Sequence, residues 1–200
     1  MTDERRKYQK KRRAEHEAKT RRRITESAVE LHGTVGPSRT SISAVAERAG
    51  VRRSTVYRHF PDEAALFDAC SSHWADANPL PDLHAWASLE DPSDRLRTAV
   101  EELYAFYRRT EGMLENLYRD EPTMPAVKLR FGAFHDYLAA ARDTVVRGRP
   151  ERGRRRGHAV AAVGHALAFS TWRSLTRDQG LDDSQAAAMM CGLVAAARSA

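Results

Sequence analysis

Apolar residues recur at helical spacing through most of this chain, and Gly and Pro divide the pattern into segments. Ile24, Ala28 and Leu31 follow the i, i+4, i+7 spacing of one buried helix face. Gly33 and Gly36-Pro37 follow and are expected to end that helix. No Gly or Pro interrupts residues 3–32, so this first helix is expected to begin well before Arg21.

Residues 45–60 predict two short helices joined by a tight turn. Gly50 ends the first of them, at a point where a positive φ fits at little cost. One face of the pair is apolar, through Val45, Ala46, Ala49, Val56 and Phe60. The opposite face of the second helix carries Arg52, Arg53, Ser54, Thr55, Tyr57, Arg58 and His59. These side chains hydrogen-bond phosphates and base edges, so the pattern favours a helix-turn-helix whose second helix enters the major groove. An ordinary helical hairpin with a solvated polar face is the alternative.

The caps of this region can also be predicted. Thr40 or Ser41 is expected to cap the first short helix, and Asp62 the helix that follows Pro61. A hydroxyl at such a helix N-terminus can also meet a phosphate.

The remaining segments are also helical in pattern, which predicts an all-α fold. Asn78–Pro81 interrupts the chain, and Asp91-Pro92-Ser93 begins a long helix. Its buried face contains Leu96, Val100, Leu103 and Tyr107, and a further helix is expected over residues 111–119. The next stripe contains Val127, Phe131, Phe134, Leu138 and Val145. Residues 147–157, rich in Arg and Gly, predict a mobile loop or a second nucleic-acid patch. The last two helices are expected over residues 158–176 and 184–197, and their Ala and Gly content permits close helix packing.

The positive charge is concentrated at the N-terminal end. Residues 1–60 hold 16 Lys or Arg against 7 Asp or Glu, a net charge of +9, whereas residues 61–200 hold 17 against 20, a net charge of −3. This distribution is typical of a polyanion-binding module followed by a domain with another role. Residues 1–23 are dense in Arg and Lys, which predicts either a solvated, partly disordered tail or an arm that follows the DNA backbone or enters the minor groove.

Several other classes of protein are disfavoured. There is no run of 18 apolar residues and no apolar signal segment, so we expect neither a membrane span nor export. Two cysteines suit a reducing cytoplasm. Cys70, His73 and His84 are residue types that ligate metals, but no second close pair completes a metal site. No nucleophile elbow, phosphate loop or zinc-protease motif occurs, so we predict no enzyme, cofactor or metal.

Residues 20–67 resemble the DNA-binding domain of the tetracycline-repressor (TetR) family of bacterial regulators. The resemblance is carried, in order and spacing, by Ala28-Val29-Glu30-Leu31-His32-Gly33, Thr40-Ser41-Ile42-Ser43-Ala44-Val45-Ala46, Ala49-Gly50-Val51, Ser54-Thr55-Val56-Tyr57-Arg58-His59-Phe60 and Ala65-Leu66-Phe67. Two positions depart from the family pattern. Arg52 stands where a small hydroxyl residue commonly caps the recognition helix, and Glu63 stands where the family usually has a phosphate-binding Lys.

The resemblance implies a regulator, most often a repressor, that binds a palindromic operator as a homodimer and is released by a small-molecule effector. The implied division is residues 1–19 as a basic arm, 20–67 as the DNA-binding domain and 68–200 as the effector-binding and dimerisation domain. The candidate DNA contacts are Thr40, Ser41, Arg52, Arg53, Ser54, Thr55, Tyr57, Arg58 and His59. The candidate effector contacts are Trp86, Tyr104, Tyr107, Met113, Phe131, Phe134, His135 and Trp172. Aromatic residues at this spacing also suit an ordinary core.

Two other functions are also compatible with the sequence. A sequence-nonspecific nucleic-acid-associated protein would use the basic tail and the Arg-rich loop. A small-molecule-binding or enzymatic helical protein would bind a ligand without affinity for DNA.

Overall fold

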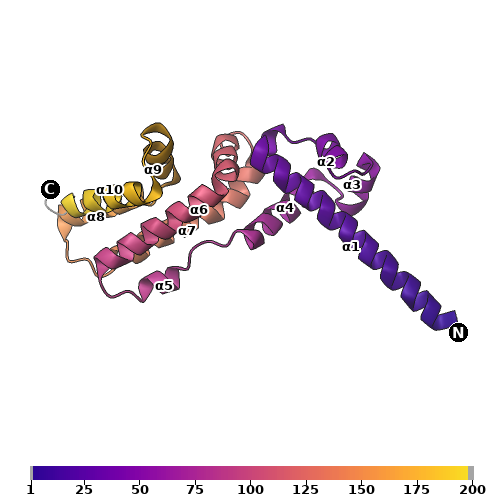
Figure 1. The fold of residues 1–200 in the computed structure, drawn as a ribbon, viewed down its shortest axis with the longest axis horizontal. Helices are drawn as coiled ribbons and strands as arrows, with labels where there is room; N and C mark the ends of the chain where they lie inside the picture. Colours follow the sequence, from indigo (N-terminus) through magenta and orange to yellow (C-terminus); the bar gives the residue numbers. More distant parts are fainter. Residues whose placement is uncertain (1, 198–200) are drawn as a thin grey trace. The chain divides into compact units, whose positions relative to one another are not determined.

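The computed structural model describes residues 2–197. Their regular secondary structure is helical, and no strand occurs among them. The elements, in order, are α1 (Thr2–Thr34), η1 (Pro37–Arg39), α2 (Ile42–Arg48), α3 (Arg53–His59), α4 (Glu63–Ala77), α5 (Leu83–Ala87), α6 (Pro92–Asp120), α7 (Pro125–Val146), α8 (Gly153–Ala166), α9 (Phe169–Arg173), η2 (Ser174–Asp178) and α10 (Asp183–Ala196) (Figure 1). The all-α prediction is confirmed. None of these helices is both long and apolar enough to cross a membrane.

The chain forms two compact units. Unit 1 contains Met1–Pro79 and Gly112–Arg130, and unit 2 contains Leu80–Glu111 and Phe131–Ala200. The domain boundary predicted at residue 67 lies inside α4.

In unit 1, α1 packs against α2, α3 and α4. Ile24 and Ala28 on α1 are fully buried, as their spacing predicts. Gly112 permits a close approach to α1, because a Cβ atom there would lie 2.9 Å from the Gly33 carbonyl oxygen. Asn116 fixes this crossing by donating its Nδ2 to the His32 carbonyl at 2.8 Å.

Unit 2 is built around a buried arginine and two buried tyrosines. Arg95 donates to backbone carbonyls at the end of α7, including that of Arg147 at 2.6 Å, and to the Leu89 carbonyl. Tyr104 and Tyr107 donate their hydroxyls to the carbonyls of Ala166 and Leu167, at 3.0 and 2.5 Å. These bonds fix the end of α8 against α6 and give a donor to carbonyls that a helix C-terminus leaves without an intrahelical partner.

Three sequence predictions about the later helices need correction. The segment over residues 111–119 is the C-terminal part of a single helix, α6, because no breaker lies between Tyr107 and Glu111. The predicted loop over residues 147–157 is shorter, since α8 already begins at Gly153. The helix predicted over residues 158–176 is broken, because Ala168 adopts an extended conformation (ψ 138°) between α8 and α9. The short helix α5 was not predicted.

Candidate nucleic-acid interface

Each short helix of the α2–α3 pair is defined by local sequence. The Ser41 hydroxyl caps α2 by accepting the Ala44 N–H at 3.1 Å, whereas Thr40 donates its hydroxyl to the Gly36 carbonyl. Of the two predicted caps, Ser41 is therefore the one used. Gly50 makes the corner with a φ of 62°, as predicted.

The position of α3 is fixed by two buried side chains. Val56 and Phe60 are 0% and 1% exposed, and they repeat at the spacing of one helix turn. At the N-terminus of α3, Arg52 is the N-cap residue and makes no side-chain cap hydrogen bond. This agrees with the expectation that arginine cannot replace a capping hydroxyl. The Asp62 carboxylate caps α4 by accepting the Ala65 N–H at 2.7 Å, also as predicted.

The polar residues of α3 are presented to solvent. The side chains of Arg53, Ser54 and Arg58 are exposed, Tyr57 is 41% exposed, and Thr55 and His59 are half-buried. Arg52 is exposed directly before the helix. The structure therefore gathers seven predicted contact residues on one short element, with two arginines at its N-terminal end.

Arg21 joins α1 to the C-terminal end of α3, a contact that sequence reasoning missed. Its Nη1 donates to the His59 carbonyl at 2.6 Å, and its guanidinium lies 4.1 Å from the centroid of the Phe60 ring. Arg21 is one of several arginines in a basic run, and nothing in the sequence distinguishes it from its neighbours. Its role is to set the direction of α1 relative to α3.

His59 carries no positive charge at neutral pH. Burial, reinforced by the charges of Arg58 and Arg21, lowers its pKa below the ordinary value of 6.5. Its Nε2 atom is shielded from solvent and has no hydrogen-bond partner within the described residues. The positive charge at this end of α3 therefore comes from the arginines.

The comparisons with known proteins agree with this geometry. Residues 24–70 match the family model described as "Bacterial regulatory proteins, tetR family". An 80-residue stretch is 32% identical to the "Probable acrEF/envCD operon repressor" of Escherichia coli K12, and it makes up 40% of this chain. Residues 24–70 of this chain are therefore a TetR-family segment. The match spans little more than a third (36%) of that relative.

Solved structures of TetR-family proteins share the fold along almost the whole chain. A TetR-like transcriptional regulator from Rhodococcus sp. RHA1 aligns over 88% of this chain and 93% of its own, with 18% identity and a TM-score of 0.63. A TetR-family transcriptional regulator from Bordetella parapertussis 12822 aligns over 87% of this chain and 93% of its own, with 19% identity and a TM-score of 0.58. At this identity the likeness establishes the fold.

The predicted effector residues are divided between the two units. Seven lie in unit 2, whereas Met113 lies in unit 1, with its Cε close to Gly33. Within unit 2, Tyr107 contacts the rings of Tyr104 and Trp172, with centroids 6.3 and 5.9 Å apart. A second group contains Phe131, Phe134 and His135, with the Phe131 centroid 5.2 Å from Phe134 and 4.8 Å from His135. Phe106 connects the groups through its contacts with Tyr107 and Phe134.

The hydroxyls of Tyr104 and Tyr107 and the indole N–H groups of Trp86 and Trp172 are already hydrogen-bonded inside unit 2. Trp172 donates its Nε1 to Asp183 at 2.9 Å, and Trp86 donates its Nε1 to Glu102 at 2.7 Å. Tyr104 and Trp172 are fully buried. Tyr104, Tyr107 and Trp172 therefore belong to the packed core, and a ligand that reached these rings would have to displace side chains.

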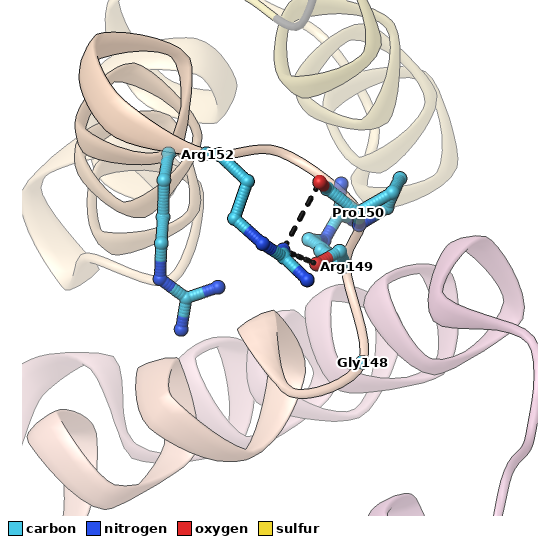
Figure 2. Close-up of a pocket in the computed structure, with 5 residues that line it drawn as sticks. Gly148, Arg149, Pro150 and Arg152 are labelled. Atoms are coloured by element: carbon cyan, nitrogen blue, oxygen red, sulfur yellow. Dashed lines mark hydrogen bonds between the residues drawn. The ribbon is translucent and has the colours of Figure 1, made fainter.

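Unit 2 has a cavity of about 490 Å³ in the Arg-rich segment between α7 and α8. It is lined by Gly148, Arg149, Pro150, Arg152 and Arg156, none of which is a predicted effector residue. Figure 2 shows the Arg152 guanidinium directed at the loop, where Nη1 donates to the carbonyls of Arg149 and Pro150 at 3.3 and 3.0 Å. Arg152 therefore stabilises the loop between α7 and α8 through hydrogen bonds to its backbone.

Cys70 does not provide a reactive thiol that would mark a functional site. Cys70 is buried, and its burial raises the pKa of the thiol to about 12, so it stays protonated at neutral pH. Among the described residues, no cluster of three or more His, Cys, Asp or Glu side chains could hold a metal ion.

Proposed function

We propose that this chain is a homodimeric repressor of transcription in the cytoplasm that reads a palindromic operator with α3. The observation that carries this proposal is that α3 has one buried apolar face and one exposed polar face. Buried Val56 and Phe60 hold the helix in place, and its arginines, hydroxyls and Tyr57 face solvent. A helix of this kind can place its N-terminal residues against base edges in the major groove.

We assign roles to the exposed residues from their chemistry. Arg52 and Arg53 begin the helix, where side chains reach base edges, and arginine pairs in a bidentate way with guanine O6 and N7. Ser54 and Thr55 are further candidates for base contacts. Thr40, Ser41, Tyr57, Arg58 and His59 are proposed to contact phosphates and so to set the register.

A dimer is supported by the exposed face of α10. Ala186, Ala187, Met190 and Val194 on one side of the helix are buried. On another side Met189 and Leu193, four residues apart, are 51% and 45% exposed. Exposed small residues lie beside them: Ala188, Gly192, Ala195 and Ala196. An apolar face with small residues suits close packing against the same helix of a second subunit, which would pair two copies of α3 around a two-fold axis.

We also propose that a small-molecule effector binds in unit 2 and weakens DNA binding. The aromatic cluster around Tyr107 supports an apolar or aromatic effector, because ligand sites between helices are mostly apolar with few polar anchors. Tyr104 and Tyr107 hold the end of α8, so a ligand that displaced their hydroxyls would change the packing of α8. The coupling required is modest, about 1–3 kcal/mol for a 5- to 150-fold change in affinity.

The proposal is tested by selection of bound duplexes from a random pool. An inverted repeat whose half-sites place two α3 helices about 34–36 Å apart, or a multiple of it, is the expected result. Enrichment of no sequence would favour the nonspecific alternative, in which the basic residues of α1 and of residues 147–156 bind any duplex. A thermal-shift ligand screen with and without the selected duplex then tests the effector, since a true effector stabilises the free protein more than the complex.

A further inference from the structure

The N-terminal residues form a charged helix that no other element covers. Helix α1 begins at Thr2, but its first buried residue in the described chain is Thr20. Residues 4–19, here called the N-terminal extension, are exposed throughout. Figure 1 shows this end of α1 continuing past α2 and α3. With a rise of 1.5 Å per residue, the extension is about 24 Å long.

The composition of the extension indicates a polyanionic partner. It holds eight Lys or Arg and three Glu, a net charge of +5. Only Tyr8, Ala14 and Ala18 are apolar, so it has no stripe that could pack against another helix. Its charge would also repel a second copy of itself. A helix of this length without tertiary packing is marginal in water, so a partner that neutralises its charge would stabilise it.

The connection to α3 indicates where that partner lies. Arg21 follows the extension directly and bonds to the last residue of α3, His59, at 2.6 Å. Since α1 is one continuous helix through Arg21, the extension, when helical, points in the direction that the Arg21–His59 contact sets. It therefore begins beside the C-terminal end of the helix proposed to lie in the major groove.

We propose that the N-terminal extension binds the phosphate backbone of the duplex that flanks each half-site. This inference rests on the proposed function. An α-helix with side chains is about 10–12 Å across, and the minor groove of B-DNA is about 6 Å wide, so the helix lies across phosphates and does not read the minor groove. At 3.4 Å per base pair, its length corresponds to about 7 base pairs. Phosphate contacts carry no sequence information, so the extension adds affinity and footprint but no base preference.

The test compares two variants that remove equal charge. R5Q/R6Q/K10Q/R12Q neutralises four exposed residues of the extension, and glutamine keeps the helix propensity. R147Q/R154Q/R155Q/R156Q neutralises four exposed residues of unit 2. The affinity for the selected duplex, with 10 added base pairs on each side, is measured against salt concentration. Each lost phosphate contact flattens the log–log slope by about 0.9, so we expect the extension variant to flatten it by at least about 2 and the unit 2 variant by less than about 1.

Two further measurements distinguish the effect of the helical conformation from that of the charge, and a phosphate contact from a base-specific contact. A14P keeps every charge but interrupts the helix, and it should shorten the nuclease footprint by several base pairs on each side. Removing the added flanks should weaken binding of the wild-type protein but not of R5Q/R6Q/K10Q/R12Q. A14P and R5Q/R6Q/K10Q/R12Q should both select the same half-site sequence as the wild-type protein.

Several results would overturn this inference while leaving the proposed function intact. They are equal salt slopes for the two variants, an unchanged A14P footprint, or a changed base preference in the extension variant. Loss of the dimer in sedimentation of R5Q/R6Q/K10Q/R12Q would make the extension a subunit contact and also refute it. Failure of the wild-type protein to bind any duplex would refute both proposals.

Discussion

Acidification should destabilise this protein through His32, a buried residue of α1. His32 is 8% exposed, its Nδ1 lies 3.4 Å from Cys70 Sγ, and its ring packs 5.6 Å from that of Phe67. Burial lowers the pKa of His32 from 6.5 to about 4, against the weaker opposing effect of the Asp120 charge. The His32 side chain therefore binds a proton less readily in the folded protein than in the unfolded chain, where its pKa is 6.5.

The sign and size of the effect follow from this difference. Above pH 6.5 the side chain is neutral in both states, and its contribution to stability is complete. Between pH 6.5 and about 4 the unfolded state binds more protons, so the free energy of unfolding falls as the pH falls. One pKa unit corresponds to about 1.4 kcal/mol, so the full loss is about 3 kcal/mol. This is a substantial fraction of the 5–15 kcal/mol typical of native proteins.

The assay is urea denaturation followed by circular dichroism at several pH values between 7 and 4.5. His32→Phe removes the titrating group and should flatten the pH dependence, whereas His16→Gln, which changes an exposed histidine of the same helix, should leave it unchanged. A parallel NMR titration should give His32 a pKa well below 6. A His32 pKa near 6.5, or the same pH dependence in His32→Phe and wild type, would refute the reasoning.

Four further substitutions test the interface. Arg53→Ala should weaken specific binding by about 1–3 kcal/mol at one base position, measured by competition with single-base operator variants; a uniform loss would assign Arg53 to phosphate. Tyr57→Phe should lower affinity with unchanged base preference, and a changed preference in the same competition would contradict a phosphate role. Ser41→Ala removes the cap on Ala44 and should reduce the unfolding free energy by about 1 kcal/mol. Gly50→Ala, at a φ of 62°, should reduce the unfolding free energy by about 1 kcal/mol or more. An unchanged denaturation midpoint in Ser41→Ala or Gly50→Ala would contradict the cap or the left-handed corner, respectively.

Much of unit 1 could be predicted because its determinants are local. Ser41, Gly50 and Asp62 act within a few residues of their own positions, through caps and a left-handed corner. The burial of Val56 and Phe60 follows from helical spacing alone. The exposed face of α3 was therefore predicted residue by residue, although which of its side chains touch bases stays a prediction.

The features that could not be predicted depend on contacts between distant residues. The end of α8 is fixed by hydroxyls of Tyr104 and Tyr107, about 60 residues away, and no Gly or Pro marks the break at Ala168. The contact between Arg21 and His59 joins residues 38 apart. Periodicity identified the aromatic residues of unit 2 but could not separate a packed core from a ligand site, since both place the same side chains on the same faces.

The most direct test of the central claim is methylation interference on the selected duplex. Dimethyl sulfate modifies guanine N7 in the major groove and adenine N3 in the minor groove, so it reports which groove each half-site contact uses. We predict interference at guanine N7 in two half-sites separated by about one helical turn, or a multiple of it, with the signal lost in Arg53→Ala. Interference confined to adenine N3, or to one half-site, would contradict a pair of α3 helices bound in the major groove.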